Sequence, residues 1–180
     1  MVLESGICDS GGEAVAAALN AVPKGTPVAC AAIDGPLVWS RSGSRRCDQA
    51  LRRAIAVRGA PSPGGTVQEV NSLRGACLAQ AVLAASAIRE ELPGLPITEA
   101  HPKVLLFLLE HAILAGMLRL REHARDAALA TISGWASIHQ PSGWSDLYRD
   151  ERNLYHLIDA PVSYWMPVRM EPLSRHPRSR

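Results

Sequence analysis

Residues 27–37, PVACAAIDGPL, join an apolar run to one carboxylate and then to two residues that end regular structure. An apolar run bounded by turn residues is typical of a strand covered on both faces, as in an α/β sheet. Gly35 and Pro36 turn the chain away directly afterwards. The stretch therefore predicts a buried strand over residues 27–33, with Asp34 at its carboxyl end.

The composition favours one compact domain. The chain has 180 residues, of which 47% are hydrophobic, and this is enough for one continuous core. We expect a single domain over residues 1–170 and a polar tail over residues 171–180. A net charge of +2 is too small to indicate nucleic-acid binding by bulk charge, so any such binding needs a local cluster of basic residues.

The cysteines and the apolar segments indicate the expected compartment. Cys8, Cys30, Cys47 and Cys77 are widely spaced and form no CxxC pair, which argues against a zinc site or a disulfide scaffold. The N-terminus has no secretory pattern, and the apolar segments 76–88 and 104–118 are too short or too interrupted to span a bilayer. We expect a soluble cytoplasmic protein with reduced thiols and no membrane partner.

The rest of the chain alternates helical and extended patterns. Spacing of apolar residues and the positions of glycine and proline predict helices over residues 13–22, 47–57, 70–92, 102–118 and 120–139. Residues 96–100 and 157–168 are expected to be extended, and residues 60–66 form the clearest loop. Helices between strands indicate parallel pairing, so the predicted class is α/β.

Three acids stand where such a fold carries its chemistry. Asp34 and Glu99 each follow a predicted strand, and the carboxyl ends of parallel strands are where sites form. Asp126 lies on a late helix, on one face with His123. Carboxylates that share Mg²⁺ or Mn²⁺ are the usual apparatus for phosphodiester hydrolysis. The acids are therefore candidate catalytic residues and metal ligands.

Each of these residues also has a purely structural interpretation. Asp34 can cap the loop that follows it, and Glu99 can be an ordinary acid at a strand end. Asp126 can pair with an arginine of its own helix. His101 and His123 are more often loop and surface residues than ligands, so the sequence keeps both interpretations open.

A cluster of arginines follows Asp34 and is the candidate substrate-binding segment. Within it, Arg45, Arg46 and Arg52 are the residues expected to contact a phosphate backbone. The alternative is a solvated helix face. Trp39, just before the cluster, can either stack on a base or close the edge of the core.

Several segments resemble those of a known family in order and spacing. They are IDGPL at 33–37, SRRCDQALRRA at 44–54, NSLRGACLAQAVL at 71–83, TEAHP at 98–102 and HARDAALATISGWAS at 123–137. Together they resemble the family catalogued as domain of unknown function 429, whose members are described as predicted nucleases with a ribonuclease H-like fold.

This resemblance implies a mixed sheet flanked by helices, with Asp34, Glu99 and Asp126 on the acidic positions of the family's motifs. Such folds begin with a three-stranded meander, and this sequence has no room for it before the first predicted helix, so the meander is expected to be missing or truncated. A sheet edge left open in this way favours association of two copies.

The sequence thus predicts a metal-dependent nuclease of ribonuclease H-like type that uses Mg²⁺ or Mn²⁺ and binds nucleic acid. Two alternatives stay open. One is a non-catalytic, truncated domain that acts through protein association, and the other is a hydrolase of a small phosphorylated metabolite.

Overall fold

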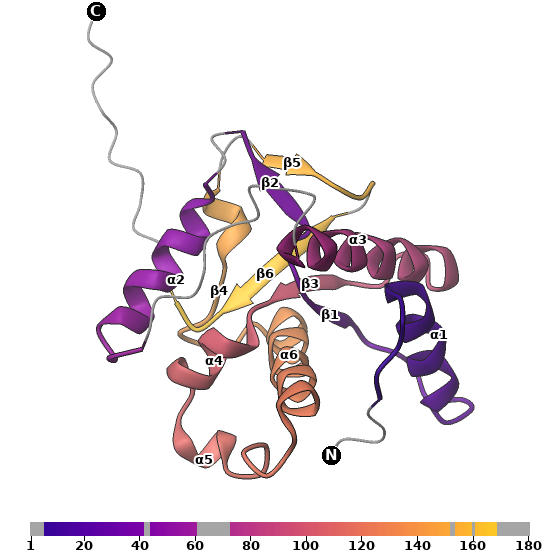
Figure 1. Cartoon of the computed structure of the whole chain (residues 1–180), viewed down its shortest axis with the longest axis horizontal. Helices are drawn as coiled ribbons and strands as arrows, with labels where there is room; N and C mark the ends of the chain where they lie inside the picture. Colours follow the sequence, from indigo (N-terminus) through magenta and orange to yellow (C-terminus); the bar gives the residue numbers. More distant parts are fainter. Residues whose placement is uncertain (1–5, 42–43, 61–72, 152–153, 160, 169–180) are drawn as a thin grey trace, which may run out of the picture.

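The computed structural model describes residues 6–41, 44–60, 73–151, 154–159 and 161–168. Most of the predicted loop 60–66 and the whole predicted tail 171–180 lie outside these residues. The predicted α/β class is confirmed, because α-helices surround a mixed sheet (Figure 1). Within the described ranges, no helix is both long and apolar enough to cross a membrane.

The main sheet has four strands in the order β1-β3-β6-β4. β1 (Ala31–Asp34), β3 (Ile97–Ala100) and β6 (Val162–Met166) are parallel, and the short β4 (Ser145–Asp146) pairs antiparallel with β6. β1 begins later than the predicted strand 27–33 and ends on Asp34 itself. β3 agrees with the predicted strand 96–100.

A second, two-stranded sheet was not predicted. It pairs β2 (Val38–Ser40) antiparallel with β5 (Leu154–His156), and it places Trp39 opposite Tyr155. Three-residue strands carry too little periodicity to be recognised in a sequence. The pairing holds the chain after Asp34 against a segment more than a hundred positions further on.

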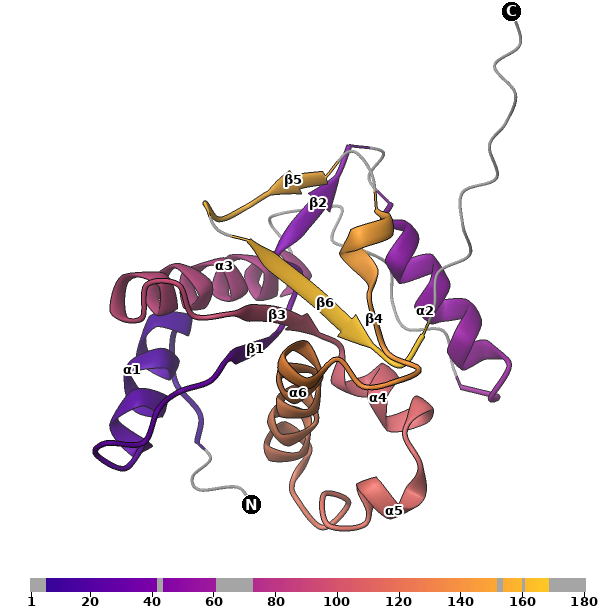
Figure 2. The same cartoon turned by 180° about the vertical axis from the view of Figure 1, so that it is seen from behind.

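The helices cover both faces of the main sheet. α3 (Leu73–Glu91) packs on one face with α1 (Gly11–Ala21) against it, and α6 (Glu122–His139) packs on the other. α2 (Arg46–Ala56), α4 (Pro102–Leu108), α5 (His111–Leu114) and the 3₁₀ helix η1 (Leu147–Asp150) complete the fold. Figure 2 shows α1 and α3 together at one end of the molecule and α2 at the other.

The single helix predicted over residues 102–118 is wrong. The helix ends at Leu108, because Leu109 and Glu110 have extended backbones, and α5 begins at His111. Leu108 and Leu114 are both buried. In one straight helix these two residues would point about 120° apart. The break lets both side chains enter the core.

The side chains of β1 alternate between the two helical layers. Ala31 and Ile33 pack with the core of α1 and α3. Ala32 faces α6, where a Cβ on Gly134 would lie 3.5 Å from the Cβ of Ala32 and 3.0 Å from Sγ of Cys30. A side chain at Gly134 would therefore push α6 away from β1.

The turn after β1 is pressed against α3. A Cβ on Gly35 would lie only 2.7 Å from the Cβ of Ala81, closer than side chains tolerate. Gly35 therefore lets the chain leave the sheet directly after Asp34 while α3 stays in contact.

Candidate functional site

Glu99 sits in a closed hydrogen-bond network. Its carboxylate is 2% exposed and accepts bonds from both terminal nitrogens of Arg45, at 2.7 Å to Oε1 and 2.9 Å to Oε2. Oε2 also accepts from the backbone N–H of Leu37 at 2.8 Å and from the hydroxyl of Tyr148. Both oxygens are thus committed to protein donors, and this does not fit the predicted role of Glu99 as a metal ligand.

Arg45 is equally enclosed. It is 4% exposed, and it also binds both carboxylate oxygens of Asp48, at 2.9 and 2.7 Å, and lies 5.7 Å from the ring centre of Tyr164. Burial alone would lower the pKa of Arg45, but the charges and hydrogen bonds of its partners, Glu99 foremost, raise it well above its usual value. Arg45 therefore serves the interior, and its predicted contact with a phosphate backbone does not fit this position.

The strand register explains why Glu99 and Asp34 are in different environments. Glu99 is level with Ile33 of β1, and Asp34 is level with Ala100 of β3. Neighbouring residues of parallel strands point to the same face, and successive residues point to opposite faces. Glu99 thus shares a face with Ile33, and Asp34 points to the face that α6 covers.

Asp34, at the carboxyl edge of the sheet, lies near enough to Asp126 to feel its charge. Crowding by protein atoms, the charge of Asp126 and then that of Glu99 raise the pKa of Asp34 from 3.8 to about 6, while Lys103 opposes the shift. The residue is nevertheless solvent-exposed, so water screens part of this effect. Asp34 is therefore an open carboxylate held near a like charge.

The orientation of α6 brings Asp126 to the carboxyl edge of the sheet. Gly134 of α6 contacts the middle of β1, and Asp126 lies eight positions earlier, at the end of α6 that approaches Asp34. Among the described residues, its buried Oδ1 accepts no hydrogen bond, but it forms an ion pair with Nε of Arg125 at 3.8 Å, as the structural alternative for Asp126 expected. A buried carboxylate oxygen without a hydrogen bond is costly and is open to a ligand.

The predicted Mg²⁺ or Mn²⁺ needs several oxygen ligands at one point. Within the described part of the chain, no three His, Cys, Asp or Glu residues are placed to hold one metal ion. A three-carboxylate set with Glu99 therefore does not form. Asp34 and Asp126 remain, and two carboxylates completed by water suit Mg²⁺, which commonly binds in this way.

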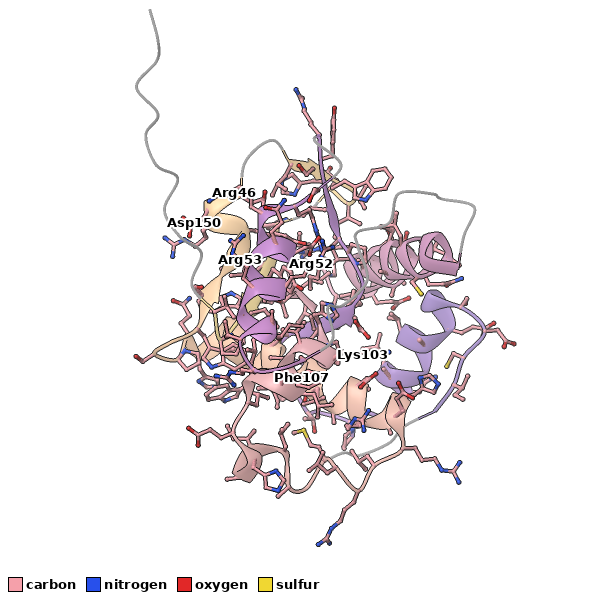
Figure 3. The ribbon with its side chains drawn as sticks, turned by 60° about the vertical axis from the view of Figure 1, so that its left-hand side comes forward. Arg46, Arg52, Arg53, Lys103, Phe107 and Asp150 are labelled. Carbon is pink, nitrogen blue, oxygen red and sulfur yellow. The ribbon has the colours of Figure 1, made fainter. Side chains whose placement is uncertain are left out.

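Lys103 lies near Asp34, and several arginines lie on the helix beside that of Lys103. Figure 3 labels Arg46, Arg52 and Arg53 along α2, and Lys103 on the neighbouring helix α4. Lys103 is close enough to Asp34 to influence its pKa. Lys103 is exposed and Arg52 is half-buried. Both side chains act on the pKa of His101, so they lie on the same side of the fold, and Lys103 is the one next to Asp34.

Arg46 and Arg58, two other members of the arginine cluster, have structural contacts. Arg46 donates to the backbone oxygen of Asp150 at 2.8 Å. The carboxylate of Glu151 accepts the backbone N–H groups of Arg46 and Cys47 at 3.1 and 2.8 Å, which fixes the start of α2. Arg58 donates to the backbone oxygens of α4 residues.

The other candidates from the sequence have mixed outcomes. Burial lowers the pKa of the half-buried His101 to about 4, so His101 is neutral near pH 7. Trp39 is also half-buried, and its indole Nε1 is enclosed without a hydrogen-bond partner among the described residues. His123 is exposed. Burial raises the pKa of the Cys47 thiol strongly, which leaves it unreactive.

Two residues of the site were not found from the sequence. Lys103 directly follows the TEAHP segment, so its position after the strand was a usable signal. Tyr148 is separated from Glu99 by 49 positions, and no spacing links the two. A comparison of the chain with protein-family models, curated proteins and solved structures finds no match.

Proposed function

We propose that the chain is a ribonuclease H-like domain and a metal-dependent nuclease that hydrolyses phosphodiesters at Asp34 and Asp126. The observation that carries the proposal is that these two carboxylates interact electrostatically at the carboxyl edge of a largely parallel sheet, where one is solvent-exposed and the other has a buried oxygen without a hydrogen bond. The resemblance of five ordered segments to a family of predicted nucleases agrees with it.

In this proposal the two acids act together. The like charge of Asp126, which helps to raise the pKa of Asp34 to about 6, is the charge that a bound cation would neutralise. Asp126 would share with Asp34 the holding of Mg²⁺ or Mn²⁺, and such a cation, when bound, supplies Lewis-acid stabilisation of the phosphate. Glu99 and Arg45 have no chemical role and fix the strand ends.

The basic side chains beside the acids would bind the substrate. Lys103 would neutralise a phosphate oxygen next to Asp34, and Arg52 and Arg53 on the neighbouring helix α2 would take further phosphates of a longer substrate. A polymer with successive phosphates uses all of these positions at once, whereas a small phosphorylated metabolite uses only those nearest the acids. The charge arrangement therefore favours a nucleic acid over a metabolite.

The experiment is cleavage of labelled single-stranded DNA and RNA, with a phosphomonoester in parallel, in the presence of Mn²⁺ or Mg²⁺. Asp34→Asn and Asp126→Asn should each reduce cleavage by about 100-fold or more, since each removes a group that acts in the transition state. Glu91→Gln, an exposed acid on α3, is the matched control and should keep full activity.

Two results would contradict the proposal. One is cleavage that persists in both Asp34→Asn and Asp126→Asn, which would place the chemistry elsewhere. The other is absence of polymer cleavage by the folded parent protein with either metal, together with turnover of the phosphomonoester, which would favour the metabolite hydrolase.

A further inference from the structure

The two edges of the main sheet are finished differently. At one edge, β4 has only two residues, and Oδ1 of Asp146 accepts the backbone N–H groups of Tyr148 at 3.1 Å and Tyr164 at 2.8 Å. A short strand closed by its own side chain resists further pairing. At the other edge, β1 has four residues, and no other described strand pairs with its outer side.

Burial shows that this outer side of β1 is open. All four residues of β3 are buried, whereas Ala31, Ala32 and Ile33 of β1 are only half-buried and Asp34 is exposed. α6 and α3 contact the two faces of β1, while no described strand lies along its outer edge. Figures 1 and 2 both show β1 as the last strand of the sheet, so its edge is open to solvent.

The backbone at this edge offers hydrogen-bonding groups. The N–H of Ala31 donates to the oxygen of Pro96 at 2.9 Å, so Ala31 turns its backbone toward β3. Backbone groups alternate along a strand, so Ala32 and Asp34 turn theirs to the outer side. Each of these residues presents one N–H and one C=O there, and an apolar edge strand of this kind is a template for another strand.

The flank of α6 extends this edge with apolar surface. The hydroxyl of Ser133 donates to the oxygen of Trp165 in β6, and the next residue, Gly134, faces β1. Going around the helix from Ser133 to Gly134 moves from the β6 side to the β1 side. Ile138, one turn after Gly134, lies further around in the same direction, beyond the outer edge of β1. Ile138 is 42% exposed and so adds a large aliphatic side chain to the surface at this edge.

We propose that β1 pairs antiparallel with β1 of a second copy of this chain about a two-fold axis, with the two α6 helices side by side over the joint sheet. Pairing centred on Ala32 sets Ala32 against its own copy and Asp34 against Cys30 of the second copy. The two Asp34 carboxylates are then roughly 13 Å apart along the strands, which is more than a Debye length of about 8 Å at physiological salt.

The second copy fits this surface better than a lone extended peptide. A four-residue ladder is far below the roughly 1,000 Å² that a stable interface buries, so the α6 flank must take part. A two-fold axis beside β1 brings the α6 flanks of both copies together, and each Ile138 gains an apolar neighbour. A lone peptide strand would leave Ile138 in water.

The experiment measures molar mass by light scattering and sedimentation over the micromolar range, at constant salt. The parent should be a dimer that dissociates on dilution. Ile138→Lys places a charge in the contact and should weaken dimerisation by about 10-fold or more. Ile113→Lys is the matched control: Ile113 is 49% exposed on α5, away from β1, and its change should leave the dimer intact.

Hydrogen exchange of the peptide that contains β1 gives an independent readout. Its amides should exchange slowly in the dimer and faster in Ile138→Lys at the same concentration, while β3 amides stay protected in both. The proposal is overturned if the parent is monomeric at high micromolar concentration. It is also overturned if Ile138→Lys leaves both the dimer and the β1 protection unchanged, or if β1 is protected in a monomer. None of these outcomes depends on nuclease activity.

Discussion

Glu99 and Asp34 are two acids at the carboxyl ends of neighbouring parallel strands, and they differ in almost every physical respect. Glu99 is buried and accepts hydrogen bonds from three residues, whereas Asp34 is exposed and lies near a like charge. The position of a residue at the end of a strand decides at which edge of the sheet its side chain lies. The register between the strands decides on which face it lies. An acid shifted by one position therefore changes from a candidate ligand to a structural residue.

The different environments of Glu99 and Asp34 indicate different roles, one in stability and one in chemistry. The Glu99 network joins β3 to the start of α2 and to η1, so its loss should affect folding. Asp34 and Asp126 hold two negative charges close together without a shared donor among the described contacts, so their loss should affect ligand binding and leave folding intact. The predictions below separate these two roles.

The largest expected effect is on stability. Glu99→Gln leaves the buried guanidinium of Arg45 without its main counter-charge, which should lower the free energy of unfolding by about 3–5 kcal/mol. Urea denaturation measures this loss. Glu91→Gln on the surface of α3 should change stability by less than about 0.5 kcal/mol. A loss below about 1 kcal/mol for Glu99→Gln would mean that Glu99 is not the centre of a buried network.

The second prediction concerns coupling between the two partners. Arg45→Met alone should also destabilise strongly, because Glu99 then stays buried and charged without its main partner. The double variant Arg45→Met/Glu99→Gln should be more stable than the sum of the single effects predicts, by about 1–3 kcal/mol. Strict additivity in the same urea experiments would contradict the pairing.

The third prediction is a small gain in stability. The folded-state pKa of Asp34 is raised from 3.8 to about 6, so the folded protein binds more protons than the unfolded chain between these values. Stability from this residue is therefore present below about pH 4 and lost as the pH rises through 6. Asp34→Asn removes this loss and should be more stable at pH 7 by roughly 1 kcal/mol, after allowance for solvent screening.

The measurement is urea denaturation of both proteins in chelator at pH 4 and pH 7. The difference between them should vanish at pH 4. His101, whose lowered pKa of about 4 acts in the opposite direction, is present in both proteins, so its contribution cancels. A gain that is equal at both pH values would show that it does not come from titration of Asp34.

The smallest expected effect concerns substrate affinity. Lys103→Ala should reduce the slope of log affinity against log salt by about 0.7 for a single-stranded ligand, since one phosphate contact is lost. Lys24→Ala, an exposed lysine in the turn after α1, is the control and should leave the slope unchanged. Fluorescence anisotropy with labelled oligonucleotides measures both. Equal slopes for all three proteins would exclude Lys103 from the contact.

Much of the fold could be predicted from local patterns. The α/β class, the strands at Asp34 and Glu99 and the helices α1, α2, α3 and α6 follow from apolar spacing and from glycine and proline punctuation. The break between α4 and α5 could not be predicted, because the apolar residues of 104–118 cover every side of a helix. The β2 and β5 strands are too short for any periodicity.

The candidate site was predicted only in part, for a physical reason. Spacing placed Asp34, Glu99 and Asp126 near one edge, but it could not give the strand register, which needs both strands. Burial of Arg45 was equally hidden, since an arginine in a basic cluster is usually solvated. Its partners, Glu99 and Tyr148, are 54 and 103 positions away.

The central claim is that Asp34 and Asp126 share one site, and titration of the Asp34 carboxyl carbon by NMR in chelator tests it most directly. We predict a midpoint near pH 6 in the parent protein, and a clearly lower midpoint in Asp126→Asn because the like charge is gone. A parent midpoint near the ordinary 3.8, unchanged in Asp126→Asn, would contradict the claim.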